Sequence, residues 1–265
     1  MLGVTEIFLI ILIIGVMLFL SEKKILKEAQ TGDEFFKKLK EKELIVSKVN
    51  ERFERIIDQF REIESLKSLK LNAYVLKERG VNAMILPSGH MFFTRDFIRF
   101  VAEEKFSDDE IAGVVAHEIA HLANGHAMRS AIRLIRMNRM HIIIFTFINL
   151  LNPIGRWKIK IMDHVTKIVS ELVKLKYSRQ EEFEADRYGT LFLSKTSFSN
   201  DGLIMALEKL QKIDSVQQID YWMSTHPPTS DRITKLKHYV RQLALNSLPA
   251  TTGWRDANKV FGAWP

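Results

Sequence analysis

The pattern of hydrophobic and polar positions differs from one part of the chain to the next, and at the N-terminus it predicts a membrane anchor. Leu2–Leu20 is almost wholly apolar, with Glu6 as its only ionisable side chain. As a helix it would be roughly 28 Å long at ~1.5 Å per residue, enough to cross the hydrocarbon core of a bilayer. No Lys or Arg precedes this run and no A-x-A-like site comes after it. We therefore expect residues 1–21 to form an uncleaved single-pass anchor in contact with membrane lipid, rather than a signal peptide.

The next pattern is helical. Between about Asp33 and Lys70, apolar residues recur at alternating spacings of three and four (Val46, Val49, Phe53, Ile56, Phe60 and Ile63). This stripe predicts an amphipathic juxtamembrane helix within residues 22–70 that packs on its own domain. A coiled-coil stalk is the alternative. Three lysines directly after the apolar run, Lys23, Lys24 and Lys27, favour a cytoplasmic location for the rest of the chain, at an inner or cytoplasmic membrane.

Residues 71–97 then show short apolar runs bounded by turn-forming residues, a pattern that is typical of strands. Three short runs, Ala73–Leu76, Ala83–Leu86 and Met91–Thr94, are separated by the turn-forming stretches "KERGVN" and "PSGH". They predict a small antiparallel sheet. Ser107 and Glu110 come next in capping-box spacing, so a helix should begin near Asp108 and end or bend at Asn124–Gly125.

The remainder of the chain is mainly helical. A face of arginines (Arg129, Arg133, Arg136 and Arg139) precedes a second apolar run, Met140–Leu151, which is too short to span a bilayer alone. This run predicts a buried helix or an interfacial membrane segment. Further helical patterns cover "SRQEEFEADRYGTLFL", "GLIMALEKLQKI" and "RITKLKHYVRQLAL". We expect an α+β, mainly α, domain over residues 71–245 and a tail over residues 246–265.

The composition of the chain limits the kinds of site and partner that it can have. The 265 residues are 46% hydrophobic and 27% charged, so the chain can bury a core. The absence of cysteine excludes a disulfide framework, a thiolate metal site and a cysteine nucleophile. The net charge of +7 is compatible with nucleic acid, but the arginine face lacks the interleaved aromatic residues of a stacking platform. We therefore expect no nucleic-acid partner.

The stretch "VVAHEIAHLANGH" carries the candidate chemistry. On a helix, His117 and His121 lie one turn apart on the same face, so both imidazoles can bind one zinc ion. Glu118 is offset by one position and can act as a general base on a zinc-activated water. H-E-x-x-H thus supplies two ligands and a base within five residues.

A catalytic zinc also needs a third protein ligand. The candidates are His126, His164, His226 and the acidic cluster "EEFEAD". Small residues beside this cluster would let its helix approach the metal helix near Gly113 and Ala120, which places Glu182 as the third ligand. Asp186, one turn on, can then accept the spare N–H of a ligating histidine. Glu181 and Glu184 are interpreted as a solvated charged face. His126 lies too far round a continuous helix to share the ion.

Three motifs in order, "HEIAH", "EFEAD" and "STHPPTSDR", resemble the membrane-associated zinc endopeptidases of the HtpX and CAAX prenyl protease type. "NAMILPSGHMFFT" is similar to the strand pair of that family. The resemblance covers roughly residues 71–243. It implies a zincin-like fold in which His117, His121 and Glu182 bind zinc and Glu118 is the catalytic base. It also implies that an exposed strand, Met91–Thr94 or Ala83–Leu86, pairs with an extended polypeptide substrate.

The chain is too short for the large membrane chamber of a CAAX protease. The resemblance therefore favours an HtpX-like endopeptidase that cleaves membrane or misfolded proteins. A catalytically silent relative that binds membrane-protein clients as a chaperone is the alternative, although such a protein has no need of Glu118. His226, ahead of two prolines, is a second candidate catalytic residue. It could donate to the oxyanion of a tetrahedral intermediate, or fill the open metal position in a resting state.

Overall fold

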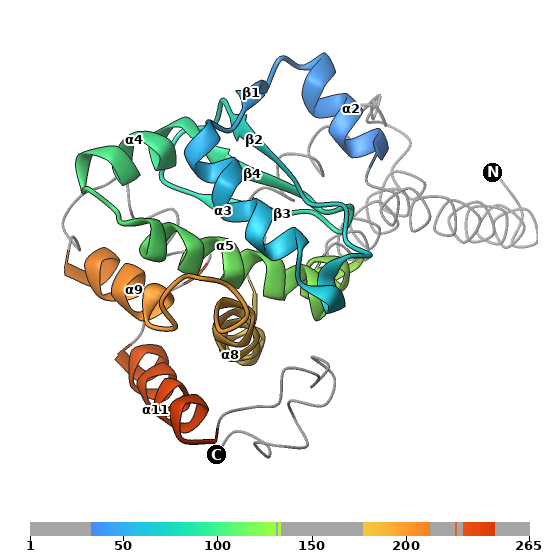
Figure 1. Cartoon of the computed structure of the whole chain (residues 1–265). Coiled ribbons are helices and arrows are strands. Elements are labelled where there is room, and N and C mark those ends of the chain that lie inside the picture. The colour runs from blue at the N-terminus through green and yellow to red at the C-terminus, as the bar shows by residue number, and fades with distance from the viewer. Residues whose placement is uncertain (1–32, 131, 134–176, 213–225, 227–229, 247–265) are drawn as a thin grey trace, which may run out of the picture.

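The computed structural model describes residues 33–130, 132–133, 177–212, 226 and 230–246. The described helices are α2 (Asp33–Glu41), α3 (Glu51–Arg61), α4 (Arg95–Glu103), α5 (Asp108–Ala123), α8 (Arg179–Leu193), α9 (Gly202–Lys212) and α11 (Ser230–Asn246), with a short 3-10 turn, η1 (Glu64–Leu66). The strands are β1 (Ile45–Lys48), β2 (Asn72–Leu76), β3 (Ala83–Ile85) and β4 (His90–Thr94). The sheet lies on one side of α5, and α8 and α9 lie on the other (Figure 1).

The three strands predicted after residue 71 are confirmed, but the purely antiparallel sheet is wrong. The strand order is β1-β2-β4-β3, and β2 runs parallel to β4. After β2, the connection from Leu76 to Ala83 leaves one strand position empty, so β3 forms the edge of the sheet. The chain then turns back, and β4 fills the position between β2 and β3. The turn before β4 requires glycine, because Gly89 has φ +85° and a Cβ there would lie 2.4 Å from the carbonyl oxygen of Lys70.

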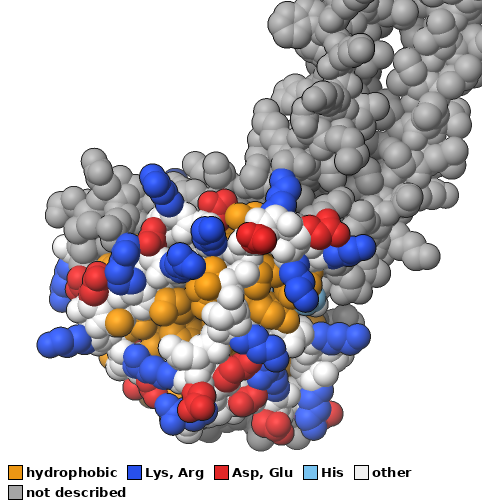
Figure 2. Space-filling view, turned by 90° about the horizontal axis from the view of Figure 1, so that it is seen from above, with side chains coloured by type: hydrophobic (Ala, Val, Ile, Leu, Met, Phe, Trp, Pro, Cys, Tyr) orange, Lys and Arg blue, Asp and Glu red, His pale blue; other side chains and the backbone are white. Residues whose placement is uncertain are grey.

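Both faces of the sheet are covered. Side chains alternate along β4, so Met91 and Phe93 join the core around α5, whereas Phe92 joins a second cluster with Leu39 of α2. Seen from above (Figure 2), hydrophobic side chains gather in the middle of the surface and are bordered by Lys, Arg, Asp and Glu.

The single helix predicted from residue 33 to residue 70 is wrong. The chain there forms α2, β1, α3 and η1. The break has a local cause, because the side chain of Asn50 accepts a hydrogen bond from the backbone N–H of Phe53 and so begins α3 as a new helix. The apolar stripe is correct within α3, whose buried Phe53, Ile56 and Phe60 belong to the same core as α5. The interpretation that this helix packs on its own domain is therefore confirmed for α3.

Helix α5 is the centre of the domain. Ser107 and Glu110 form the predicted capping box, the helix begins at Asp108, and it ends at Ala123 before Gly125, which has φ +70°. Every residue from Glu110 to His121 is buried. Two glycines permit this close packing. A Cβ on Gly189 of α8 would lie 3.1 Å from the backbone of Ala116, whereas Gly113 lies against α9, and not α8 as the sequence suggested.

Several expectations concern residues outside the described part of the chain. These are the apolar run Leu2–Leu20, the segment Met140–Leu151, His164, the arginines Arg136 and Arg139, and the tail after residue 246. Within the described ranges, none of the helices combines the length and the apolar character needed to cross a bilayer.

Candidate active site

The two histidines of the H-E-x-x-H motif converge as their spacing predicts. His117 and His121 lie one turn apart on α5, and the Nε2 atoms of their rings are 3.1 Å apart. Both side chains are completely buried. Two ring nitrogens that face each other in this way cannot both carry a hydrogen, so the position between them suits a cation.

Glu182 reaches the same point from α8. Its Oε2 lies 3.5 Å from Nε2 of His117, and its Oε1 lies 3.4 Å from Nε2 of His121. The local sequence explains its place, because Ser178 and Glu181 form a second capping box that begins α8 one turn before the site. The close approach of Gly189 to α5 then brings the first turns of α8 beside both histidines.

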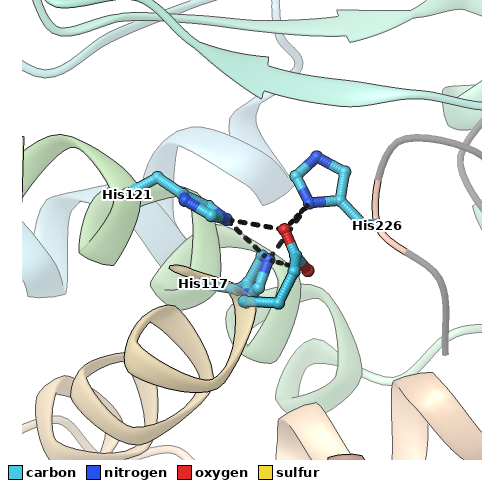
Figure 3. Close-up of side chains that lie close together, drawn as sticks. His117, His121 and His226 are labelled. Atoms are coloured by element: carbon cyan, nitrogen blue, oxygen red, sulfur yellow. Dashed lines mark hydrogen bonds and ion pairs between the residues drawn. The ribbon is translucent and has the colours of Figure 1, made fainter. Parts of the chain in front are cut away.

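His226 completes the group. Its Nδ1 lies 3.3 Å from Nε2 of His117 and 3.0 Å from Oε1 of Glu182. Figure 3 shows the three imidazoles directed toward one another, two from α5 and one from the segment before α11. One ligand atom from each of His117, His121, Glu182 and His226 lies within 4.8 Å of the other three. The structure thus brings His226 to the predicted ligands, while His126 is outside this group.

The four residues offer a set of donor atoms that suits a zinc site. Zinc binds nitrogen and oxygen at ~2.0–2.1 Å, so neighbouring ligand atoms in a tetrahedron are roughly 3.3 Å apart. Five separations among the ring nitrogens and the two carboxyl oxygens of Glu182, 3.0 to 3.5 Å, are close to that spacing, and one ligand atom from each residue lies within 4.8 Å of the others. Charge gives a second argument. Glu118, Glu182 and Asp186 are buried carboxyl groups that share one buried guanidinium, Arg232, so a divalent cation would neutralise the remaining negative charge.

Glu118 lies beside the group without joining it. It is completely buried, and neither carboxyl oxygen has a hydrogen-bond partner in the part of the chain that the structure describes. Nε2 of His226 is 3.8 Å from Oε1 of Glu118. Burial raises the pKa of Glu118, although the nearby charges of His226 and His117 oppose this effect. A carboxyl group with a raised pKa and free lone pairs is suited to proton transfer.

Asp186 lies behind His117, where the sequence had placed it. Its Oδ1 is 3.0 Å from Nδ1 of His117, the ring nitrogen opposite the metal position. Burial alone would raise the pKa of Asp186, but the charge and hydrogen bonds of Arg232 lower it. The same guanidinium pairs with Glu182 at 2.8 Å from Nη1 to Oε2. With His226, its charge holds the pKa of Glu182 well below the usual range, against the opposing effect of burial.

Sequence analysis did not identify Arg232. It belongs to "HPPTSDR" and begins an amphipathic helix, a position where arginine is usually solvated. The signal that could have found it is the pair of buried carboxylates one turn apart on α8, which needs a cation.

The interpretation of Glu181 and Glu184 as a solvated face is wrong for Glu181. Glu181 is only 6% exposed, and it pairs with Arg129 and Arg133, two members of the arginine face. The capping box also fixes the orientation of this side chain, because Oε2 of Glu181 accepts a hydrogen bond from the backbone N–H of Ser178. Glu184 is partly buried and lies 3.1 Å from Nε2 of His126.

Tyr177 was also missed by sequence analysis. Its ring stacks on that of His121, with centroids 3.8 Å apart and an angle of 18° between the planes. Burial raises the pKa of its hydroxyl well above the usual range. Tyr177 therefore forms an uncharged wall of the site at neutral pH.

Comparison with known proteins finds similar sequences among peptidases. The sequence model described as peptidase family M48 matches residues 47–240. Among curated proteins, the human mitochondrial metalloendopeptidase OMA1 is 24% identical over 207 residues, which cover 77% of this chain and 39% of OMA1. A protease HtpX homolog of Bacillus licheniformis is 28% identical over 51% of this chain and 52% of its own length. The metalloprotease YcaL of Escherichia coli is 27% identical over 51% of this chain and 50% of its own. The chain therefore spans about half or less of these relatives.

Proposed function

Because the chain belongs to peptidase family M48, we propose that it is a zinc-dependent endopeptidase that cleaves membrane or misfolded proteins. The resemblance to membrane-associated zinc endopeptidases is confirmed at the level of the family. The observation that carries the proposal is the convergence of ligand atoms of His117, His121 and Glu182 within 4.8 Å of one another. The carboxyl group of Glu118 lies beside them and has no hydrogen-bond partner among the described residues.

Each residue has a distinct part in the proposed reaction. His117, His121 and Glu182 hold the metal, and zinc when bound supplies a Lewis acid that lowers the pKa of water toward neutrality. Glu118 takes a proton from the attacking water and returns it to the leaving nitrogen. Oδ1 of Asp186, 3.0 Å from Nδ1 of His117, is placed to hold a hydrogen on that nitrogen, so that Nε2 of this ring presents its lone pair.

His226 has two candidate roles. Its Nδ1 stands among the ligand atoms, which supports a resting arrangement in which His226 fills the fourth metal position. A substrate would then have to displace it, because a catalytic zinc needs an open position. After displacement, the same side chain could donate to the oxyanion of the tetrahedral intermediate.

The sheet supplies a candidate surface for an extended substrate. β3 lies at an edge of the sheet, packed near α5, whereas β4 lies between β2 and β3 and is not an edge. Thr94 donates its backbone N–H to the carbonyl oxygen of Asn82, so alternation along β3 directs the backbone groups of Ala83 and Ile85 away from β4. A substrate strand that pairs with these groups would lie alongside the metal helix.

A membrane location is part of the proposal. It rests on the apolar run Leu2–Leu20, which is long enough to anchor the domain, and on the lysines after it. These lysines favour a catalytic domain on the cytoplasmic side. An anchored peptidase would meet membrane-protein substrates at the bilayer surface.

The proposal is tested with the full chain purified in detergent and assayed for cleavage of casein. Cleavage should stop when 1,10-phenanthroline removes the metal and should return when zinc is added. Cleavage that resists the chelator would contradict a zinc-dependent reaction. Stoichiometric zinc without cleavage of casein or of membrane proteins would favour the client-binding alternative.

A further inference from the structure

His121 is linked to a second histidine on the side away from the metal position. Its Nδ1 lies 2.9 Å from Nδ1 of His126, and Nε2 of His126 lies 3.1 Å from Oε2 of Glu184. The side chains of His121 and His126 are both completely buried, and that of Glu184 is 35% exposed. The three residues therefore form a chain that runs from the ligand cluster to the protein surface.

Hydrogen-bond chemistry gives this chain a direction. A carboxylate only accepts, so the Nε2 of His126 that faces Glu184 must carry the hydrogen. A neutral His126 then has a lone pair on Nδ1, and the facing Nδ1 of His121 must donate to it. The remaining nitrogen of His121, Nε2, is left with its lone pair directed at Glu182 and His117. This is the tautomer that a metal ligand needs.

The backbone places His126 for this contact. On an uninterrupted helix, five residues correspond to a rotation of roughly 140° from His121, which would separate the two side chains. Instead α5 ends at Ala123, Gly125 adopts φ +70°, and helical backbone resumes at His126. Arg129 supports the turn by donating to the carbonyl oxygen of Asn124 at 2.9 Å.

Glu184 is also held in place. Gln180, one turn earlier on α8, donates its amide to Oε1 of Glu184 at 3.1 Å, which leaves Oε2 for His126. The first turns of α8 thus contribute to both sides of the ligand cluster. Glu182 faces the metal position, and Glu184 faces the back of His121 through His126.

From these contacts we infer that His126 is a positioning residue that fixes the tautomer and ring orientation of His121, and that Glu184 in turn orients His126. The inference rests on the proposed function, because it requires His121 to be a metal ligand. In this arrangement His126 supports His121, as Asp186 supports His117. The two supports differ, since Asp186 acts directly through a buried charge and Glu184 acts through a neutral imidazole.

The test is the zinc affinity of the full-length chain, measured by competition with a fluorescent zinc chelator. Removing an orienting partner of a metal-binding histidine typically costs about 10- to 100-fold in metal affinity, and we expect this loss for His126→Ala. His126→Asn should stay within several-fold of wild type, because the Asn Oδ1 stands near the place of the histidine Nδ1 and still accepts from His121. Glu184→Ala, at a partly exposed position, should show an intermediate loss.

Two controls separate positioning from simple packing. His238→Ala removes an exposed histidine of α11 and should leave zinc affinity unchanged. The melting temperature of each metal-free variant reports the packing effect, which should be similar for His126→Ala and His126→Asn, while their zinc affinities differ. Should His126→Ala not fold, His126→Asn and Glu184→Ala carry the comparison with wild type.

Tight zinc binding in wild type, with equal affinity in His126→Ala, would overturn the inference and leave the proposed function intact. An Asn variant as weak as the Ala variant would also overturn it, because the loss would then not depend on an acceptor. A wild-type chain that does not bind zinc would defeat the proposed function itself.

Discussion

Arg232 holds Asp186 through two parallel hydrogen bonds, from Nη2 to Oδ1 at 2.6 Å and from Nε to Oδ2 at 2.8 Å. Both side chains are 1% exposed. The remaining guanidinium nitrogen pairs with Glu182, so one arginine of α11 binds the two acidic residues of α8 that surround His117. This arrangement makes α11 part of the site, although α11 contributes no proposed metal ligand.

Arg232→Met should destabilise the fold strongly. The substitution leaves two buried carboxylates without their cation, and breaking a buried pair costs about 3–5 kcal/mol. The free energy of unfolding from urea denaturation of the metal-free chain measures this cost. Lys237→Met is the matched control, because Lys237 lies on the exposed side of the same helix and pairs with Glu208 of α9, and surface pairs contribute about 0–1 kcal/mol. Equal losses in the two variants would contradict the buried network.

Glu182→Ala should lower the amount of zinc that copurifies with the chain. The substitution removes an oxygen ligand and leaves the two histidines of α5 in place, so weak binding should persist at high zinc concentration. Metal content by mass spectrometry gives the stoichiometry, with Glu208→Ala as a control on a partly exposed carboxylate of α9. Unchanged stoichiometry would move the third ligand to another residue, such as His226 or His164.

His226→Ala separates the two roles of this histidine. Since Nδ1 of His226 stands among the ligand atoms, we expect zinc affinity to fall by about tenfold, in the lower part of the range for a changed metal site. The chelator competition assay measures this change, and steady-state kinetics at saturating zinc measure kcat. A variant with wild-type affinity and a lower kcat would instead assign His226 to oxyanion stabilisation alone.

Gly113→Ala should destabilise the packing of α5 against α9. A Cβ at this position would lie 2.4 Å from the backbone nitrogen of Leu203, and backbone atoms cannot move aside as a flexible side chain can. Overpacking of this kind typically costs about 1–3 kcal/mol. Urea denaturation tests this expectation, and a variant as stable as wild type would contradict so close an approach between the backbones of α5 and α9. Ala102→Gly, at an exposed position of α4, is a control for the change in helix propensity.

Local patterns predicted the central elements of the fold well. The capping box of Ser107 and Glu110 placed the start of α5, and Gly125 marked its end, because both depend only on neighbouring residues. The convergence of His117 and His121 follows from helix geometry alone. The position of β4 between β2 and β3 was not predictable in this way, since the connection before β3 permits either arrangement.

Charged residues were harder to interpret than apolar ones. Glutamate usually lies at the surface, yet Glu181 is buried because it pairs with Arg129 and Arg133, which are distant from it in the sequence. Arg232 was missed for the same reason, because its partners lie on another helix. A single sequence gives the spacing of charges along one helix but not the pairing between helices.

The measurement that tests the central claim most directly compares wild type with Glu118→Gln for zinc content and for casein cleavage. Gln keeps the shape of the side chain but cannot take a proton, and general-base catalysis typically contributes about 10²- to 10⁴-fold to a rate. We therefore predict near-stoichiometric zinc in both proteins and cleavage only by wild type. Full activity in Glu118→Gln, or no zinc in either protein, would contradict the assignment of this site as a metallopeptidase centre.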